Sequence, residues 1–221
     1  MDRFKVAVLI PAYNEEKTIS GIVETVNKYG QPIVIDDGSN DKTGEQAKKS
    51  GAIVETHITN LGYDAALNTG FKKIKECNYD FVITLDADGQ HEPELLKKFI
   101  EELNSGVSLV LGVRNKKARI AEYIFGFYTR MRFGIEDPLC GLKAYKIESY
   151  KSVGYFDSYK SIGTELMFQN IFLGKEYRQV YFNIKNRSGS TRFGNTLLGN
   201  LRILRSFLFF VFKRYGDVKK K

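Results

Sequence analysis

Short apolar runs alternate with segments of helical periodicity through the first half of the chain. The apolar runs that predict strands are residues 4–10, 32–35, 52–56, 81–85 and 108–112. Between the first two runs, apolar side chains recur at helical spacing over residues 19–26. Strands and helices that alternate at this spacing predict an α/β fold, in which helices cover both faces of a mostly parallel sheet.

The remaining periodic segments are predicted in the same way. Asn14 is expected to cap the first helix, and Pro93 is expected to stand in the first turn of another, since proline is favoured there. The other predicted helices are residues 62–76, 116–135, 161–173 and 197–215, and residues 180–184 alternate as a strand does.

Polar residues gather where three of the predicted strands end. The first strand runs into residues 11–15, the second into residues 36–39 and the fourth into residues 86–90. In open parallel sheets, ligands bind outside the carboxyl ends of the strands. These three clusters therefore predict a ligand site on one rim of the sheet.

Asp86 and Asp88 flank a single residue at the end of the fourth strand, so both carboxylates can point the same way. Mg²⁺ commonly takes one or two carboxylates and completes its shell with phosphates and water. The pair therefore suits a metal–diphosphate site, although aspartates at strand ends also make turns. The segment 36–41 has the same two interpretations, a turn with a helix cap or a partner for a nucleoside.

Composition narrows the class of protein. The chain has 221 residues, which suits one domain with or without an appendage. Its two cysteines imply no disulfide framework, and we expect neither a signal peptide nor a membrane-spanning stretch. A net charge of +8 suits nucleic acid, anionic lipid or phosphorylated substrates, but no recognised nucleic-acid motif occurs and we expect no such partner.

Four motifs in order carry a resemblance to a known family. PAYNEE, DDGSNDKT, NLGYDAALNTG and DADGQHEPE together resemble the GT-A glycosyltransferases of family 2. Downstream, DPLCGLKAY resembles the D-P-x-S-G-F-R-A-Y segment of the polyprenyl-phosphate sugar synthases, among them dolichol-phosphate mannosyltransferase, with Cys140 in place of the serine. RSGSTR resembles their R-x-G-x-S-K segment, with Arg192 in place of the lysine.

The resemblance implies a GT-A (Rossmann-like) fold and an inverting glycosyltransferase that takes a UDP- or GDP-sugar as donor. Mg²⁺ or Mn²⁺ would be the cofactor, with Asp88 as a catalytic residue. The implied metal ligands are Asp86, Asp88 and Gln90. The implied donor-binding residues are Pro11, Ala12, Tyr13, Glu15, Asp37 and Asp86. A nucleotidyltransferase also uses paired aspartates, but PAYNEE differs from the glycine-rich basic loop usual in that class.

Two acceptor classes remain open at this point. A sugar hydroxyl needs a general base, for which Glu165 is placed best along the chain. A polyprenyl phosphate is already ionised and needs cations instead, and arginine binds phosphate oxygens through its bidentate fork. The candidate phosphate ligands are Arg114, Arg119, Arg187 and Arg192. The later motifs favour the polyprenyl phosphate.

The basic, aromatic and apolar segment after residue 196 is treated as a C-terminal amphipathic helix. We expect a glycosyltransferase domain over residues 1–196 and this helix within residues 197–221. The helix is too short to cross a bilayer but fits the membrane interface. The alternatives are docking on the domain's own core, on a membrane protein or on a second copy. We expect a cytoplasmic protein, peripheral on the membrane.

Overall fold

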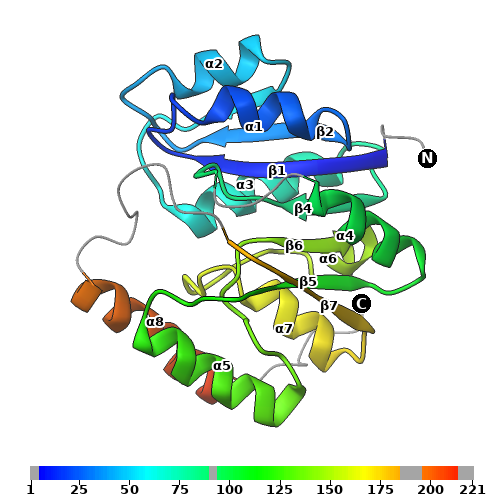
Figure 1. Cartoon of the computed structure of the whole chain (residues 1–221), viewed down its shortest axis with the longest axis vertical. Helices are drawn as coiled ribbons and strands as arrows, with labels where there is room; N and C mark the ends of the chain where they lie inside the picture. The colour runs from blue at the N-terminus through cyan, green and yellow to red at the C-terminus, as the bar shows by residue number, and fades with distance from the viewer. Residues whose placement is uncertain (1–4, 90–93, 185–195, 214–221) are drawn as a thin grey trace.

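The computed structural model describes residues 5–89, 94–184 and 196–213 of the chain (Figure 1). In chain order along its single sheet, the strands are β1 (Val6–Ala12), β2 (Gln31–Asp36), β3 (Ile53–Thr56), β4 (Phe81–Thr84), β5 (Leu109–Arg114), β6 (Lys143–Lys146) and β7 (Tyr177–Phe182). The helices are α1 (Ile19–Val26), α2 (Thr43–Lys49), α3 (Tyr63–Lys75), α4 (Leu95–Asn104), α5 (Ile120–Phe133), α6 (Ile147–Val153), α7 (Glu165–Phe172) and α8 (Thr196–Phe212).

The strand order in this sheet is β3-β2-β1-β4-β6-β5-β7. All pairings are parallel except those of β6, which runs antiparallel to both β4 and β5. The predicted mostly parallel α/β sheet is therefore confirmed. β6 was not predicted, because its four residues, KAYK, place a lysine at each end and show no apolar run.

Helices cover both faces of the sheet, as predicted. One buried cluster lies between the sheet and α1 and α4, and it includes Ile19, Val23 and Phe99. The other lies on the opposite face beneath α3, α5, α6 and α7. Two residues of α8, Ile203 and Phe210, belong to this second cluster, so α8 packs into the same core as the rest of the domain.

The pairing between β1 and β4 stops where a proline enters β1. The Leu85 N–H donates to the Leu9 carbonyl at 3.0 Å. The next bond of this parallel ladder would come from the N–H of residue 11, and Pro11 has none. β2 and β3 lie on one side of β1 and β4 on the other. The strand order thus reverses beside β1, where such sheets open a crevice for ligands.

Asn14 and Pro93 were both expected at the starts of helices. Asn14 does not cap the first helix, because α1 begins at Ile19 with Thr18 in the capping position. Asn14 instead has a positive φ of 54°, its N–H donates to the hydroxyl of Ser39, and its side-chain oxygen accepts from the N–H of Asn40. Asparagine tolerates that conformation better than most residues. Pro93 lies outside the described residues.

Candidate active site

The antiparallel register of β4 and β6 determines the surroundings of Asp86. Thr84 lies opposite Lys143, so two residues further along β4 the side chain of Asp86 comes opposite Gly141. A side chain on Gly141 would clash with the Asp86 carboxylate. The hydroxyl of Thr84 holds Gly141 in place by donating a hydrogen bond to the Gly141 carbonyl at 2.6 Å. Glycine is therefore required at residue 141 to leave the carboxylate its room.

The second carboxylate of the motif lies in the turn after Asp86, against the loop that follows β1. The hydroxyl of Thr18 donates to the carbonyl of Ala87 at 2.7 Å. The same hydroxyl lies 3.2 Å from a carboxylate oxygen of Glu15, whose N–H donates to Thr43 at 2.7 Å. Asp88 is almost completely buried in this turn. The ends of β1 and β4 are thus joined through side chains.

The two aspartates fit a hard divalent cation in part. Carboxylate oxygens are its preferred ligands, and Asp86 has the space that Gly141 leaves. Among the described residues, no group of three or more histidine, cysteine, aspartate or glutamate side chains could hold a metal. Two carboxylates with the rest of the shell left to water and substrate is the pattern of a Mg²⁺ site that takes part in binding a diphosphate. Gln90, the third predicted ligand, lies outside the described residues.

Asp37, predicted to bind the nucleoside, holds the loop that leads into α3. Its two carboxylate oxygens accept hydrogen bonds from the N–H groups of Leu61 and Gly62, at 2.9 and 2.8 Å. The Nδ1 of His57 lies 2.7 Å from one of them, and its Nε2 lies 2.9 Å from the Thr69 hydroxyl. His57 was not predicted to have a functional role. A contact between Asp37 and a nucleoside stays a prediction, because these bonds already use both oxygens.

The other predicted donor-binding residues lie on the same rim. Pro11 and Ala12 end β1 opposite Ile35 and Asp36, and both are buried. Tyr13 follows them and is partly exposed, and Glu15 is buried beside Thr18. The structure therefore brings the predicted donor residues together at the ends of β1, β2 and β4. Their individual contacts with a donor remain predictions.

Lys143, which was not predicted as a site residue, also lies at this rim. It is the first residue of β6, which runs against β4, so it lies at the carboxyl rim beside Asp86. The side chain is buried, and its ammonium donates to the Cys140 carbonyl at 2.6 Å. Burial lowers the pKa of this lysine, and the charges of Asp137 and Asp86 oppose the shift. A signal existed in the sequence, because Lys143 aligns with the arginine of the D-P-x-S-G-F-R-A-Y segment.

Arg114 makes an ion network inside the protein. Its Nε and a second guanidinium nitrogen bind the two oxygens of Asp137 at 2.7 and 2.9 Å, and it pairs with Glu122 at 2.9 Å. Burial alone would raise the pKa of Asp137, but the hydrogen bonds and charge of Arg114 hold it below the usual value. These bonds use the Nε and one terminal nitrogen of the guanidinium, and a phosphate contact of Arg114 stays a prediction.

Arg119, the next predicted phosphate ligand, stands at the start of α5 where α8 crosses it. It lies 3.4 Å from the carboxylate of Glu122, and a side chain on Gly199 of α8 would clash with it. Arg187 and Arg192 lie outside the described residues. Of the four predicted acceptor ligands, the structure thus describes two, and both lie next to Glu122.

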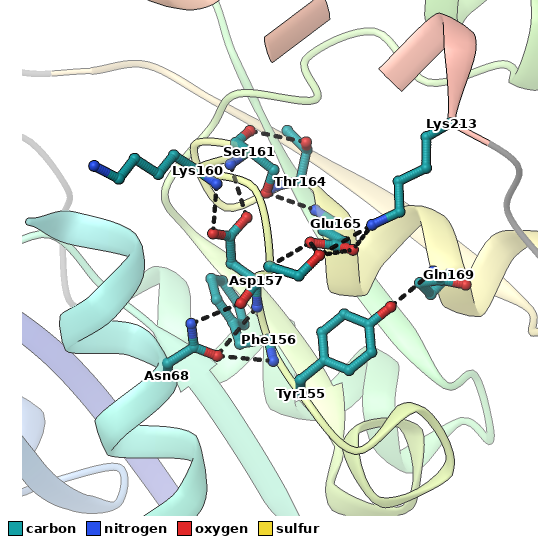
Figure 2. A network of polar contacts seen from close by, with 11 residues as sticks. Asn68, Tyr155, Phe156, Asp157, Lys160, Ser161, Thr164, Glu165, Gln169 and Lys213 are labelled. Carbon is teal, nitrogen blue, oxygen red and sulfur yellow. Dashed lines mark hydrogen bonds and ion pairs between the residues drawn. The ribbon is translucent and has the colours of Figure 1, made fainter. Parts of the chain in front are cut away.

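Glu165, the predicted general base, is completely buried at the start of α7. Figure 2 shows its carboxylate between the loop before α7 and the end of α8. It accepts hydrogen bonds from the N–H and the hydroxyl of Ser158, at 2.6 and 2.8 Å. It also forms an ion pair with Lys213, whose ammonium lies over the ring of Tyr159. A carboxylate held in this way is poorly placed to accept a proton from a substrate.

The loop before α7 is held from both halves of the molecule. Lys160 and Ile162 both have φ of 59°, a region that non-glycine residues seldom adopt. Asp64, in the first turn of α3, accepts hydrogen bonds from the N–H groups of Ile162 and Gly163 at 3.2 and 2.7 Å. Burial, helped by the charge of Asp157, raises the pKa of Asp64 to about 6. This carboxylate therefore links α3 to the loop that α8 contacts.

The fold and the acidic rim at its switch point define a glycosyltransferase of the GT-A type. The chain belongs to Glycosyl transferase family 2, whose family model matches residues 7–138. An uncharacterised protein of Methanocaldococcus jannaschii is 34% identical over 192 residues, which cover 80% of this chain and 78% of that protein. Dolichol-phosphate mannosyltransferase of Pyrococcus furiosus is 26% identical over 223 residues, which cover 90% of this chain but only 62% of that enzyme.

A solved structure extends the likeness in fold beyond the matched family region. Glucosyl-3-phosphoglycerate synthase of Mycobacterium tuberculosis, in complex with Mn²⁺, UDP and phosphoglyceric acid, superposes with a TM-score of 0.74 at 23% identity. The match covers 94% of this chain and 78% of that one. The likeness therefore includes the less regular second half of the chain, for which the sequence pattern was weakest.

Proposed function

We propose that this glycosyltransferase moves a sugar from a nucleoside diphosphate to a polyprenyl phosphate, with inversion at the anomeric carbon. The observation that carries the proposal is the position of Asp86 and Asp88. They lie at the end of β4, beside the point where Pro11 ends the pairing with β1. A donor diphosphate at this point faces carboxylates that can hold a cation against it.

A bound Mg²⁺ or Mn²⁺ would neutralise charge that develops on the leaving diphosphate. Asp86 and Asp88 are the residues that would hold it, with Gln90 predicted from the motif. The rim residues Pro11, Ala12 and Tyr13 lie where the nucleoside of the same donor would extend. UDP and GDP donors both suit this rim, and in the fold's Mycobacterium tuberculosis neighbour, Mn²⁺ and UDP are bound together.

The acceptor assignment rests on what Glu165 does in this structure. A hydroxyl nucleophile needs a proton acceptor, whereas a phosphate monoester is already ionised near neutral pH. The carboxylate of Glu165 is buried and paired with Lys213, which favours the acceptor that needs no base. The name of the Pyrococcus furiosus relative points to the same class, a dolichol phosphate.

A lipid acceptor also gives a use to an exposed apolar surface. We call it the α5–α8 face, because α5 and α8 lie side by side at the lower edge of Figure 1 and contact each other. On α5, Ile120, Phe127 and Met131 are 74%, 70% and 74% exposed, and on α8, Phe212 is 81% exposed. Exposed arginines, including Arg130 and Arg202, lie on the same helices. No described helix combines the length and apolar character that crossing a bilayer requires.

The proposal is tested by incubating the protein with UDP- and GDP-sugars, Mn²⁺ and a short polyprenyl phosphate. We expect one donor to yield a lipid-linked sugar product, and excess EDTA to remove the activity. Transfer of the sugar to a free saccharide hydroxyl, with the polyprenyl phosphate unused, would contradict the acceptor assignment.

Membrane contact is tested by sedimentation with phosphatidylglycerol vesicles. Each exposed phenylalanine that enters the bilayer interface contributes roughly 2 kcal/mol. Replacing both Phe127 and Phe212 by serine should therefore weaken binding at least tenfold. Ile58→Ser is the matched control, because Ile58 is fully exposed on the loop after β3. Equal binding by the control and the double variant would exclude the α5–α8 face as the membrane contact.

A further inference from the structure

Lys143 differs from Arg114 and Glu165, two other charged residues that are buried or partly buried. Arg114 and Glu165 each contact at least two partners that satisfy their charge. The ammonium of Lys143 has three N–H donors, and one of them goes to the Cys140 carbonyl. Within the described part of the chain, no carboxylate oxygen lies within 4.0 Å of its nitrogen.

Burying the Lys143 ammonium with only one hydrogen bond to the described residues lowers the stability of the protein when no ligand is bound. Burying an ammonium without satisfying its donors costs free energy, so buried charges are normally paired. Lys143 is 3% exposed. The cost therefore calls for an anion that is bound at this rim in the working protein.

The surroundings of Lys143 indicate where that anion lies. The residue begins β6 at the carboxyl rim, two positions after Gly141, which packs against the Asp86 carboxylate. On its other side, Gly163 comes close enough that a side chain there would lie 3.9 Å from the ammonium. The ammonium is thus enclosed between the Asp86 corner and the strained loop before α7, on the β6 side of β4.

We propose that the Lys143 ammonium donates hydrogen bonds directly to a phosphate oxygen of a bound substrate. This inference rests on the proposed function, since it assigns a further binding residue to the same site. The phosphate belongs either to the nucleoside diphosphate of the donor or to the phosphate monoester of the acceptor. Both present the same ionised oxygens, which prefer a charged donor.

The chain offers a matched control on the same strand. Lys146, the last residue of β6, also donates from its ammonium to a backbone carbonyl, that of Gly106, at 2.7 Å. It lies at the opposite end of β6, opposite Phe81 rather than Thr84. Lys146→Met therefore removes the same charge and the same kind of bond from the same strand, away from the rim.

The experiment measures dissociation constants by calorimetry for wild type, Lys143→Met, Lys143→Gln and Lys146→Met. The probes are UDP, GDP, farnesyl phosphate, inorganic pyrophosphate and the free nucleosides, each with Mn²⁺ and again with EDTA. A lost charged hydrogen bond should weaken the phosphate probes about 10- to 100-fold in both Lys143 variants. Nucleoside binding, and every binding by Lys146→Met, should stay unchanged.

The arms of the experiment separate the sources of the phosphate. A loss confined to nucleoside diphosphates places Lys143 at the donor, and a loss confined to farnesyl phosphate places it at the acceptor. A loss seen with Mn²⁺ but absent in EDTA would overturn the proposal, because Lys143 would then act through the metal ligands. If wild type binds pyrophosphate through Lys143 but no nucleotide, the proposed function fails and this inference stands. Absence of any phosphate binding by wild type would overturn both.

Thermal unfolding without ligands provides an independent readout. If the ammonium is kept for a ligand, Lys143→Met should unfold at the wild-type temperature or above it, because an unsatisfied buried charge has been removed. A lower unfolding temperature or loss of fold in both Lys143→Met and Lys143→Gln would overturn the inference, since the fold itself would then need the lysine.

Discussion

The two halves of the rim place their charged residues in opposite ways. At the ends of β1, β2 and β4, where we propose that the donor binds and which we call the donor half, carboxylates are positioned by backbone N–H groups and by room that glycine leaves, as at Asp37 and Asp86. In the half built from α5, α7 and α8, arginine, lysine and glutamate are paired with one another, as Glu165 is with Lys213. The first arrangement positions single carboxylates at the rim, and the second uses charge to join helices.

This difference shows why a charged residue at a motif position need not contact a substrate. Arg114 and Glu165 were both assigned to the acceptor by their positions in the sequence. In the structure both have partners of opposite charge, and Glu165 is completely buried while Arg114 is partly buried. Breaking such a buried pair by removing one partner is strongly destabilising. For mutations in the half built from α5, α7 and α8, the stability of the variant must therefore be measured before its activity is interpreted.

The largest effect is expected at the donor half, for Asp88→Asn. The amide keeps the shape of the side chain but removes the charge that would hold a cation against the diphosphate. We expect turnover to fall more than about 10³-fold, which corresponds to roughly 4 kcal/mol of transition-state stabilisation. The free energy of unfolding, measured in urea, should change little. Full activity in this variant would mean that the donor half does not use a metal.

The meeting of the strand ends and acidic motifs at one rim was predicted, because its signals are local. Strand ends, turn residues and acidic motifs coincide in the sequence, and a parallel sheet brings strand ends to one rim without further information. The contacts of His57 with Asp37 and of Thr18 with Ala87 were not predictable. They join loops from different strands, and no periodicity in the sequence records which loops meet.

The next effect concerns whether α8 is part of the domain or an appendage. Phe210 stacks on Phe168 of α7 with ring centroids 4.0 Å apart and also meets Phe125 of α5. Phe210→Ala should lower the free energy of unfolding by about 3–4 kcal/mol, as is typical for a buried aromatic ring. Phe212→Ala, two residues away and largely exposed, should change it by less than about 0.5 kcal/mol.

A small effect of Phe210→Ala would show that α8 is detachable. The predicted domain boundary at residue 196 would then coincide with a boundary in stability. A large effect would instead make deletion of the helix unsuitable as a test of membrane binding, because the fold would be lost together with the apolar surface. That is why the vesicle test above replaces exposed side chains only.

A smaller effect is expected for Glu165→Gln, and it separates the acceptor classes. Loss of the pair with Lys213 should cost about 1–3 kcal/mol of stability, less than a fully buried pair because Lys213 is partly exposed. Lys213→Met should cost a similar amount, and the double variant should cost less than the sum, by about 0.5 kcal/mol or more. Below the unfolding temperature, turnover should change less than tenfold.

A general base in this position predicts a different pattern. Glu165→Gln would then lower turnover by about 10²–10⁴-fold, while Lys213→Met would leave the chemical step nearly intact. Arg187→Ala is the companion measurement. For a phosphate acceptor it should impair use of the lipid, and for a hydroxyl acceptor it should matter little.

The second half could not be predicted in this detail because its contacts are long-range. The sequence indicated helices at residues 116–135, 161–173 and 197–215, and the structure has α5, α7 and α8 in those segments. Helical periodicity does not say which helix covers which face, nor that Lys213 reaches Glu165 across 48 residues. The short strand β6 was missed for the same reason, because its pairing with β4 and β5, rather than its own pattern, defines it.

The last expected effect is a change of stability with pH at Asp64, which connects the two halves. Its pKa in the folded protein is raised to about 6 from 3.8, so between these values the folded state binds a proton that the unfolded chain has released. The stabilisation from this group is therefore complete below about pH 4 and is lost as the pH rises through about 6. Asp64→Asn cannot titrate, so the stability of wild type relative to this variant should fall over that window and stay constant above it.

Asp157→Asn removes the neighbouring charge that helps to raise the pKa of Asp64, and it should narrow the window from its upper end. Urea unfolding at half-unit pH steps from 4 to 7 measures both. A flat difference between wild type and Asp64→Asn would mean that Asp64 is ionised throughout, and that the link between α3 and the loop before α7 is insensitive to pH.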